Sequence, residues 1–232
     1  MAKKKEKPAE VVEKFKKESV GEVVRDRFMP YSMSVIVSRS LPAIDGFKPS
    51  QRKVLYTMYQ MGLLTGIRTK SANIAARTML LNPHGDVANY ETMVRMTTQN
   101  ETLLTPWVDG KGSFGKHYSR DMQCAAARYT EAKLAGVASE LFKSLNKNTV
   151  DMVDNYDSTR KEPALLPVTF PNILANPTDG IAVGMASRIP SFNLKELCAA
   201  TVLRIMYPNK DIRTVMPSPD FATGGYILME DD

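Results

Sequence analysis

The feature that most limits the fold of this 232-residue chain is a change of pattern near residue 148. Before that point apolar residues recur at helical spacing, whereas residues 150–156 alternate as in a strand and prolines then recur. We therefore predict an α+β protein. We expect a basic arm at 1–18, a mostly helical domain at 19–147 and the start of an α/β domain at 148–232. Its last stretch is rich in turn residues and holds no closing element, so we expect this domain to be truncated.

The first domain is predicted to be a series of helices joined by short turns. Helices are expected over 20–28, 49–63, 71–81 and 86–98. Pro30 should end the first, and Asp86 should cap the last. Two helices joined by a tight turn have the shape of a motif whose second helix enters the DNA major groove, although most helix pairs bind nothing. On that second helix, Tyr90, Met93 and Val94 should face the core, and Val87, Glu91 and Arg95 should face outward.

Three more elements are predicted further along the chain. An amphipathic helix is expected over 130–145, with a strand at 181–186 and a second helix at 194–206. The buried stripe of the first of these comprises Leu134, Val137, Ala138, Leu141 and Leu145. Tyr129 would then lie at a helix start, where free backbone N–H groups help to hold an anion.

Composition narrows the classes of function. The net charge is +6 and the isoelectric point is about 9.2, which favours a polyanionic partner such as nucleic acid, although a merely basic protein has the same charge. The two cysteines lie far apart and only two histidines are present, so a structural zinc site and a site of several histidines are not expected. No apolar run is long enough to cross a bilayer and no secretory signal is recognisable, so we expect a cytoplasmic protein with no membrane contact.

Two segments carry basic residues that call for a ligand. Lys48, Arg52 and Lys53 cluster at a helix start, where positive charge opposes the helix dipole unless a phosphate is bound. Residues 110–115 match Gly-x-Gly-x-x-Gly, but we reject a dinucleotide site because Pro106 precedes the loop and no apolar helix follows it. A sugar-phosphate backbone fits this basic, aromatic loop better.

The strongest chemical candidate is the pair Arg128 and Tyr129. A tyrosine can attack a phosphodiester, and an adjacent guanidinium can stabilise charge on the phosphate oxygens. A free phenol has a pKa of roughly 10 and needs help from cations or a metal. From these residues alone, an ordinary packing role for Tyr129 is the commoner alternative.

The motifs taken together resemble the A subunit of bacterial type IIA DNA topoisomerases, the family of DNA gyrase and topoisomerase IV. The resemblance begins near Val20 and runs to the end of the chain. It rests on six segments: Tyr31-Ser-Met-Ser-Val-Ile-Val through Arg39, Asp45-Gly-Phe-Lys-Pro, Pro83-His-Gly-Asp, Gly112-Ser-Phe-Gly, Ala127-Arg-Tyr-Thr-Glu and Gly180-Ile-Ala-Val-Gly-Met-Ala. It implies a winged-helix DNA-cleavage domain followed by the first part of a tower domain.

The resemblance also assigns roles. Tyr129 would form a 5′-phosphotyrosyl link during double-strand cleavage, and Arg128 would stabilise the transition state. Arg39, Lys48, Arg52 and His84 would contact phosphates, and Ile189 would be a wedge between base pairs. The alternatives are a winged-helix module that binds DNA without cutting it and an assembly module that only builds a dimer.

The same resemblance implies partners and cofactors. No metal site is expected in this chain; Mg²⁺ and ATP would be held by a B subunit, and two A subunits would form an A2B2 heterotetramer on double-stranded DNA. The sequence does not separate gyrase from topoisomerase IV, or supercoiling from decatenation. Asn82 departs from the histidine of most relatives, which weakens any phosphate contact there. Val87 and Glu91 occupy fluoroquinolone-site positions, and valine cannot hold the bridging water, so we expect weak drug action.

Overall fold

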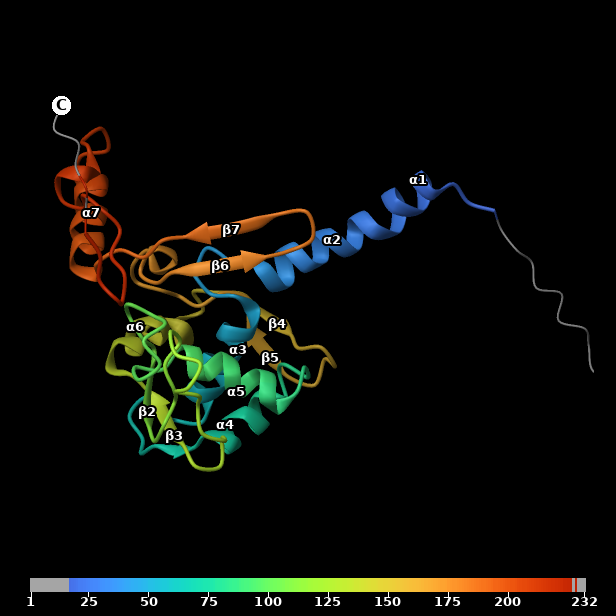
Figure 1. Cartoon of the computed structure of the whole chain (residues 1–232), viewed down its shortest axis with the longest axis horizontal. Helices are drawn as coiled ribbons and strands as arrows, with labels where there is room; N and C mark the ends of the chain where they lie inside the picture. Colours follow the sequence, from blue (N-terminus) through green and yellow to red (C-terminus); the bar gives the residue numbers. More distant parts are fainter. Residues whose placement is uncertain (1–16, 227, 229–232) are drawn as a thin grey trace, which may run out of the picture.

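The computed structural model describes residues 17–226 and residue 228. The predicted arm at 1–18 therefore lies almost wholly outside the described residues. The described part is a mixed α+β protein, as predicted, with a helical body and a helical segment that projects from it (Figure 1). None of the helices described is both long enough and apolar enough to span a bilayer.

The helical body combines a group of helices with a small sheet. The helices are α3 (Pro49–Gln60), α4 (Ser71–Thr78) and α5 (Asp86–Arg95). The antiparallel sheet has the order β1-β3-β2, formed by Thr69–Lys70, Glu131–Leu134 and Val108–Lys111. Their inner faces share one core, whose largest fully buried side chains include Leu55, Met58, Ile74, Met93 and Trp107.

Local sequence explains two of the helix starts. Pro49 stands in the first turn of α3, where a missing N–H costs nothing, and the Gln51 side chain accepts from the Lys48 backbone N–H at 2.9 Å. At α5 the cap is Gly85, with φ +112°, and Asp86 is the first helical residue rather than the predicted cap. The helix also ends at Arg95, earlier than expected.

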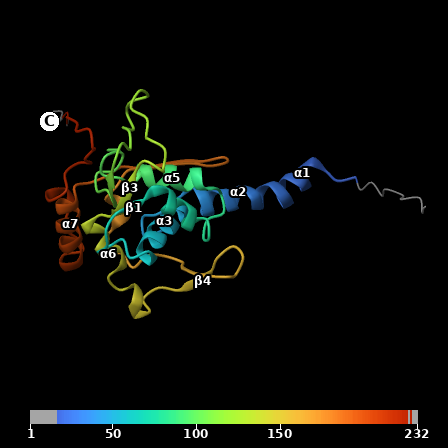
Figure 2. The ribbon, with the colours of Figure 1, turned by 90° about the horizontal axis from the view of Figure 1, so that it is seen from below.

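The N-terminal segment is helical throughout, so the predicted break at Pro30 is wrong. The elements α1 (Val20–Val23), η1 (Val24–Phe28), α2 (Met29–Val35) and η2 (Ile36–Ser40) follow one another without interruption and extend from the body (Figures 1 and 2). The turn before the proline is a wide π turn, in which the Met29 N–H donates to the Val24 carbonyl. The wider turn leaves room for the proline ring, which would otherwise meet the carbonyl of the preceding turn.

The predicted helix over 130–145 is also wrong. Residues Glu131–Leu134 form β3, the central strand of the sheet, and only short helical turns follow at η3 (Gly136–Ala138), α6 (Ser139–Phe142) and η4 (Leu145–Lys147). Ala132 and Leu134 point into the core from the strand, while Ala138 and Leu141 reach it from the turns. Tyr129 therefore precedes a strand, and the expected helix-start anion site does not exist there.

The remainder of the chain contains two hairpins and a helix. The hairpins are β4 (Met152–Asp154) with β5 (Lys161–Pro163), and β6 (Thr178–Ile181) with β7 (Ala186–Ile189). The single strand predicted at 181–186 is wrong because the chain turns there, with Gly184 at φ +77°. Between and after the hairpins come η5 (Asn172–Leu174), α7 (Leu194–Met206), as predicted, and η6 (Ile212–Thr214). Leu197 and Ala200 of α7 help to form a second, smaller core.

Candidate nucleic-acid interface

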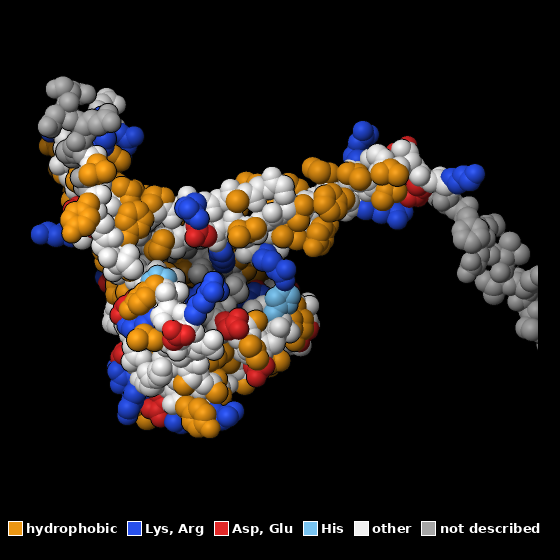
Figure 3. Space-filling view, viewed as in Figure 1, with side chains coloured by type: hydrophobic (Ala, Val, Ile, Leu, Met, Phe, Trp, Pro, Cys, Tyr) orange, Lys and Arg blue, Asp and Glu red, His pale blue; other side chains and the backbone are white. Residues whose placement is uncertain are grey.

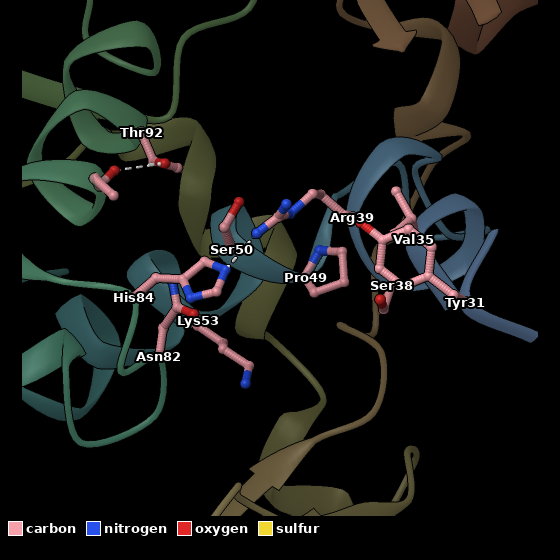
Figure 4. Close-up of a pocket in the computed structure, with 11 residues that line it drawn as sticks. Tyr31, Val35, Ser38, Arg39, Pro49, Ser50, Lys53, Asn82, His84 and Thr92 are labelled. Carbon is pink, nitrogen blue, oxygen red and sulfur yellow. Dashed lines mark hydrogen bonds between the residues drawn. The ribbon is translucent and has the colours of Figure 1, made fainter. Parts of the chain in front are cut away.

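A groove lies between the end of the projecting helical segment and the helical body. It has a volume of about 540 Å³ and is open to solvent. Its lining comes from α2 and η2, from the first turns of α3, from the turn before α5 and from α5 itself, and comprises Tyr31, Val35, Ser38, Arg39, Pro49, Ser50, Lys53, Asn82, His84, Ala88 and Thr92 (Figure 4). On the face shown in Figure 3, basic side chains gather where the β6–β7 hairpin and the helical segment meet the body.

Arg39 and His84 meet across this groove. Arg39 Nη2 lies 2.6 Å from His84 Nε2, and the two side chains reach toward each other in Figure 4. Because a guanidinium can only donate, His84 Nε2 is the acceptor of this hydrogen bond. Arg39 is therefore the cation of the pair, and an arriving phosphate oxygen can take over its N–H donor.

The other basic residues near the groove are already held by the protein. Lys48 Nζ donates to the Asp179 backbone oxygen at 2.6 Å, and burial together with the positive charge of Arg95 lowers the pKa of its ammonium group. Lys53 Nζ donates to the Leu81 carbonyl and lies 3.2 Å from Glu162 Oε1.

Asn82 also faces inward. Its amide donates to Asn89 Oδ1 at 2.8 Å, and the Asn89 amide donates back to the Asn82 carbonyl at 3.2 Å. Asn82 is thus part of a pair that fixes the turn before α5. This contact accounts for Asn82 without a phosphate.

Arg52 does not belong to the interface, which corrects the prediction made for it. Its side chain is buried, with 8% of the residue exposed, and donates from Nε and Nη2 to the carboxylate of Asp45 at 2.6 and 2.9 Å. The same carboxylate accepts from the backbone N–H of Phe47 and of Leu166. The charge of Arg52 is therefore neutralised inside the fold, and Asp45 links it to Leu166, a residue far away in sequence.

Arg128 and Tyr129 are exposed, as a reaction with a large substrate requires. Tyr129 is 66% exposed, and Arg128 Cζ lies 4.7 Å from the centre of the tyrosine ring. The phenol is therefore not a core side chain, and a guanidinium stands beside it. Tyr129 is not among the residues that line the Arg39–His84 groove. Within one chain, the tyrosine and the groove are therefore two separate sites.

Ile189, the residue predicted as the wedge, belongs to the β6–β7 hairpin. Ile189 is the last residue of β7, opposite Thr178 at the base of the hairpin, and is only partly exposed. Ile181, at the far end of β6, is 86% exposed. Its backbone carbonyl accepts from Ser40 Oγ at 2.8 Å, which ties the hairpin to the end of η2. The sequence prediction placed Ile181 inside one strand at 181–186, although Gly184 in the middle of that run was the signal for a turn.

The outer face of α5 agrees with its prediction. Val87 and Glu91 are exposed, while Tyr90, Met93 and Val94 are buried. No three His, Cys, Asp or Glu side chains of the described residues lie close enough together to hold a metal ion.

An exposed arginine–tyrosine pair and a basic groove on an α+β body are the features of a nucleic-acid-binding protein. Comparison with known proteins identifies its family. The family of DNA gyrase/topoisomerase IV A subunits matches residues 39–232, and the chain belongs to this family. Among its relatives, the DNA gyrase A subunit of Chlamydia pneumoniae is 48% identical over 215 residues. The gyrase A subunits of Streptococcus pneumoniae serotype 4 and Thermotoga maritima are 47% and 44% identical over 208 and 209 residues.

These alignments cover most of this chain but a small part of each relative. They include 90%, 87% and 88% of the chain, and 25%, 25% and 26% of the relatives. The chain thus spans about a quarter of the length of the relatives it matches.

Proposed function

We propose that this chain is the DNA-cleaving part of the A subunit of an ATP-dependent type II DNA topoisomerase. The observation that carries the proposal is the exposed Tyr129 beside Arg128 in a chain of this family. Helices α3 to α5 with the sheet β1-β3-β2 are read as the winged-helix domain at 19–147, and 148–232 as the first part of a tower domain. The complete enzyme would change DNA supercoiling or decatenate DNA.

The proposed reaction exchanges one phosphodiester for another. The Tyr129 phenol oxygen attacks a DNA phosphorus and gives up its proton, a bond forms to the 5′ phosphate, and the 3′ oxygen leaves and is protonated as a hydroxyl. Arg128 stabilises the negative charge that develops on the phosphate oxygens. Because the phosphodiester energy is kept in the phosphotyrosyl bond, the reverse attack by the 3′ hydroxyl reseals the strand.

DNA contacts are proposed from exposure and charge. Arg39 and His84 of the groove would meet phosphates, and the outer face of α5 would lie along the DNA. Lys48 would join them by exchanging its hydrogen bond to the Asp179 backbone oxygen for a phosphate oxygen. We propose Ile189 of the β6–β7 hairpin as the wedge between base pairs, as the family resemblance implies.

The proposed partners supply the remaining parts of the reaction. A B subunit would hold Mg²⁺ and ATP, and two A subunits, each with one Tyr129, would cut the two strands within an A2B2 complex. Exposed apolar side chains along the projecting segment, including Phe28, Met33 and Val37, support such assembly, since a partner commonly covers apolar surface of this kind. We infer a cytoplasmic location, where bacterial DNA lies.

One observation favours a second candidate, a winged-helix module that binds DNA without cutting it. Tyr129 is absent from the lining of the Arg39–His84 groove, so a single chain could bind a phosphate there without placing it at the phenol. The two candidates differ in one measurable product, the covalent protein–DNA link.

The test combines the full-length A subunit with its B subunit, Mg²⁺ and supercoiled plasmid. Detergent trapping should leave protein on DNA 5′ ends, and Tyr129→Phe should abolish this product while DNA binding persists. Tyr118→Phe, which alters another exposed tyrosine, is the matched control and should leave cleavage intact. A Tyr129→Phe enzyme that still forms the 5′ link would refute the role of Tyr129 as nucleophile, whereas a wild-type complex that binds DNA and forms no link would support the non-catalytic candidate.

A further inference from the structure

The segment that carries Arg128 and Tyr129 is fixed on both sides by backbone hydrogen bonds. The first N–H groups of α4, which have no partner inside their helix, donate to it: Ser71 N–H to the Thr130 carbonyl at 3.0 Å and Ala72 N–H to the Ala127 carbonyl at 3.1 Å. Arg128 and Tyr129 lie between these two attachment points. The start of α4 thus sets the position of the backbone on each side of the candidate nucleophile.

A buried side-chain network adds a third attachment from α5. The Tyr90 hydroxyl donates to the Ala125 carbonyl at 2.7 Å and lies 3.1 Å from Thr130 Oγ1, which is in turn 2.8 Å from Ser71 Oγ. Thr130 and Ser71 are fully buried and Tyr90 is 7% exposed. The Tyr90 hydroxyl donates to the Ala125 carbonyl and the Thr130 hydroxyl donates to Ser71 Oγ, so both of these buried donors have an acceptor.

The surroundings leave this segment little freedom. Ala125 N–H donates to the Ser113 carbonyl at 2.9 Å, and a Cβ at Gly112 would lie 3.2 Å from Thr130 Cγ2. Burial also raises the pKa of the Tyr90 hydroxyl, so it remains a donor throughout the neutral range. The Tyr90 hydroxyl contacts both ends of the segment 125–130, at Ala125 and at Thr130. Each of the other groups that hold this segment contacts it at one end only.

We infer that Tyr90 is a positioning residue for DNA cleavage: its hydroxyl holds the segment 125–130 from α5 and so fixes the place from which Tyr129 attacks. This inference rests on the proposed function. It assigns to Tyr90 a role beyond filling the core, because Tyr90→Phe keeps the ring against Phe114 and removes only the hydroxyl.

The expected effect is on the rate of cleavage rather than on DNA affinity. A shift of the nucleophile by an ångström or less lowers the rate steeply, so we expect cleavage by Tyr90→Phe to fall about tenfold. The salt-dependent Kd for DNA should stay within about twofold, because Tyr90 is buried and contacts no phosphate. Thr130→Val should act in the same direction, and Thr130→Ser, which restores a hydroxyl, should recover most of the rate.

The experiment measures single-turnover cleavage of plasmid by the full-length A subunit with Mg²⁺ and its B subunit. Hydrogen–deuterium exchange of the peptide covering residues 122–131 is followed in the same proteins and should be faster in Tyr90→Phe. Tyr56→Phe, which removes a hydroxyl from a tyrosine of α3 that is 8% exposed, is the control and should change neither readout.

The outcomes separate the two levels of inference. If the wild-type complex forms no phosphotyrosyl link, the proposed function fails and the positioning role fails with it. If the wild type cleaves and Tyr90→Phe cleaves equally fast with unchanged exchange, the positioning role alone is overturned. Loss of cleavage in Thr130→Ser equal to that in Thr130→Val would also overturn it, because the hydroxyl would then not be the active group.

Discussion

Arg52 provides the sharpest test of a structural assignment that departs from the sequence prediction. Replacing it with alanine leaves the Asp45 carboxylate, which is 1% exposed, without its charged partner among the described residues. The carboxylate keeps two hydrogen bonds, from the backbone N–H groups of Phe47 and Leu166, but loses the opposite charge that compensates its burial. Removing one partner of a buried ion pair costs about 3–5 kcal/mol, and we expect a loss in this range from Arg52→Ala.

The assay is urea unfolding of the 232-residue chain, followed by circular dichroism. With an unfolding slope of about 2–3 kcal/mol per molar urea, the midpoint should fall by about 1–2.5 M. Arg52→Lys keeps the charge but not the two-pronged geometry and should fall between the wild type and alanine. Arg213→Ala breaks an exposed Arg–Asp pair and should leave the midpoint unchanged.

The reasoning would be refuted if Arg52→Ala unfolded at the wild-type midpoint while losing DNA affinity. That result would return Arg52 to the surface role predicted from sequence. A lower midpoint with unchanged DNA affinity of the folded fraction is the outcome the buried ion pair requires.

Three further perturbations test other parts of the structure. Gly180→Ala places a Cβ 2.5 Å from the Ser40 carbonyl oxygen, so it should displace the β6–β7 hairpin, lower stability by about 1–3 kcal/mol in the same urea assay and expose the hairpin to protease. Arg39→Ala should weaken DNA binding about equally for all sequences and reduce the slope of log K against log salt by about 1, as measured by fluorescence anisotropy. Val87→Ser, with Glu91 kept, should increase fluoroquinolone-stabilised cleavage complexes in the full-length enzyme; an unchanged dose response would remove the drug-site assignment.

Helix positions were predictable where periodicity and terminal signals agreed. The proline at the start of α3 and the regular apolar spacing of α7 located both helices correctly. The stretch after Tyr129 failed because its apolar residues fit two arrangements. Leu134, Ala138 and Leu141 are all buried, yet one comes from a strand and two come from helical turns. Only pairing with β1 and β2, which are remote in sequence, selects the strand.

The candidate site was predictable in its chemistry but not in its burial. Arg39, His84, Arg128 and Tyr129 are exposed, as their proposed roles require, whereas Arg52 looked equivalent to its basic neighbours in sequence. Its interior position depends on Asp45, whose carboxylate also binds the Leu166 backbone. The spacing of residues near Arg52 in the sequence cannot predict a contact between Asp45 and Leu166.

Under the proposed function, the rigid backbone around Tyr129 has a consequence for the severed strand. A DNA end bonded to this phenol is tethered through a side chain with two rotatable bonds, mounted on a backbone that α4 and α5 anchor. This short connection restricts the distance between the 5′ phosphate and the 3′ hydroxyl, so the two ends stay close to the geometry that rejoining requires. Fidelity of resealing would then depend on the stiffness of protein beneath the tyrosine as much as on the groups that touch phosphorus.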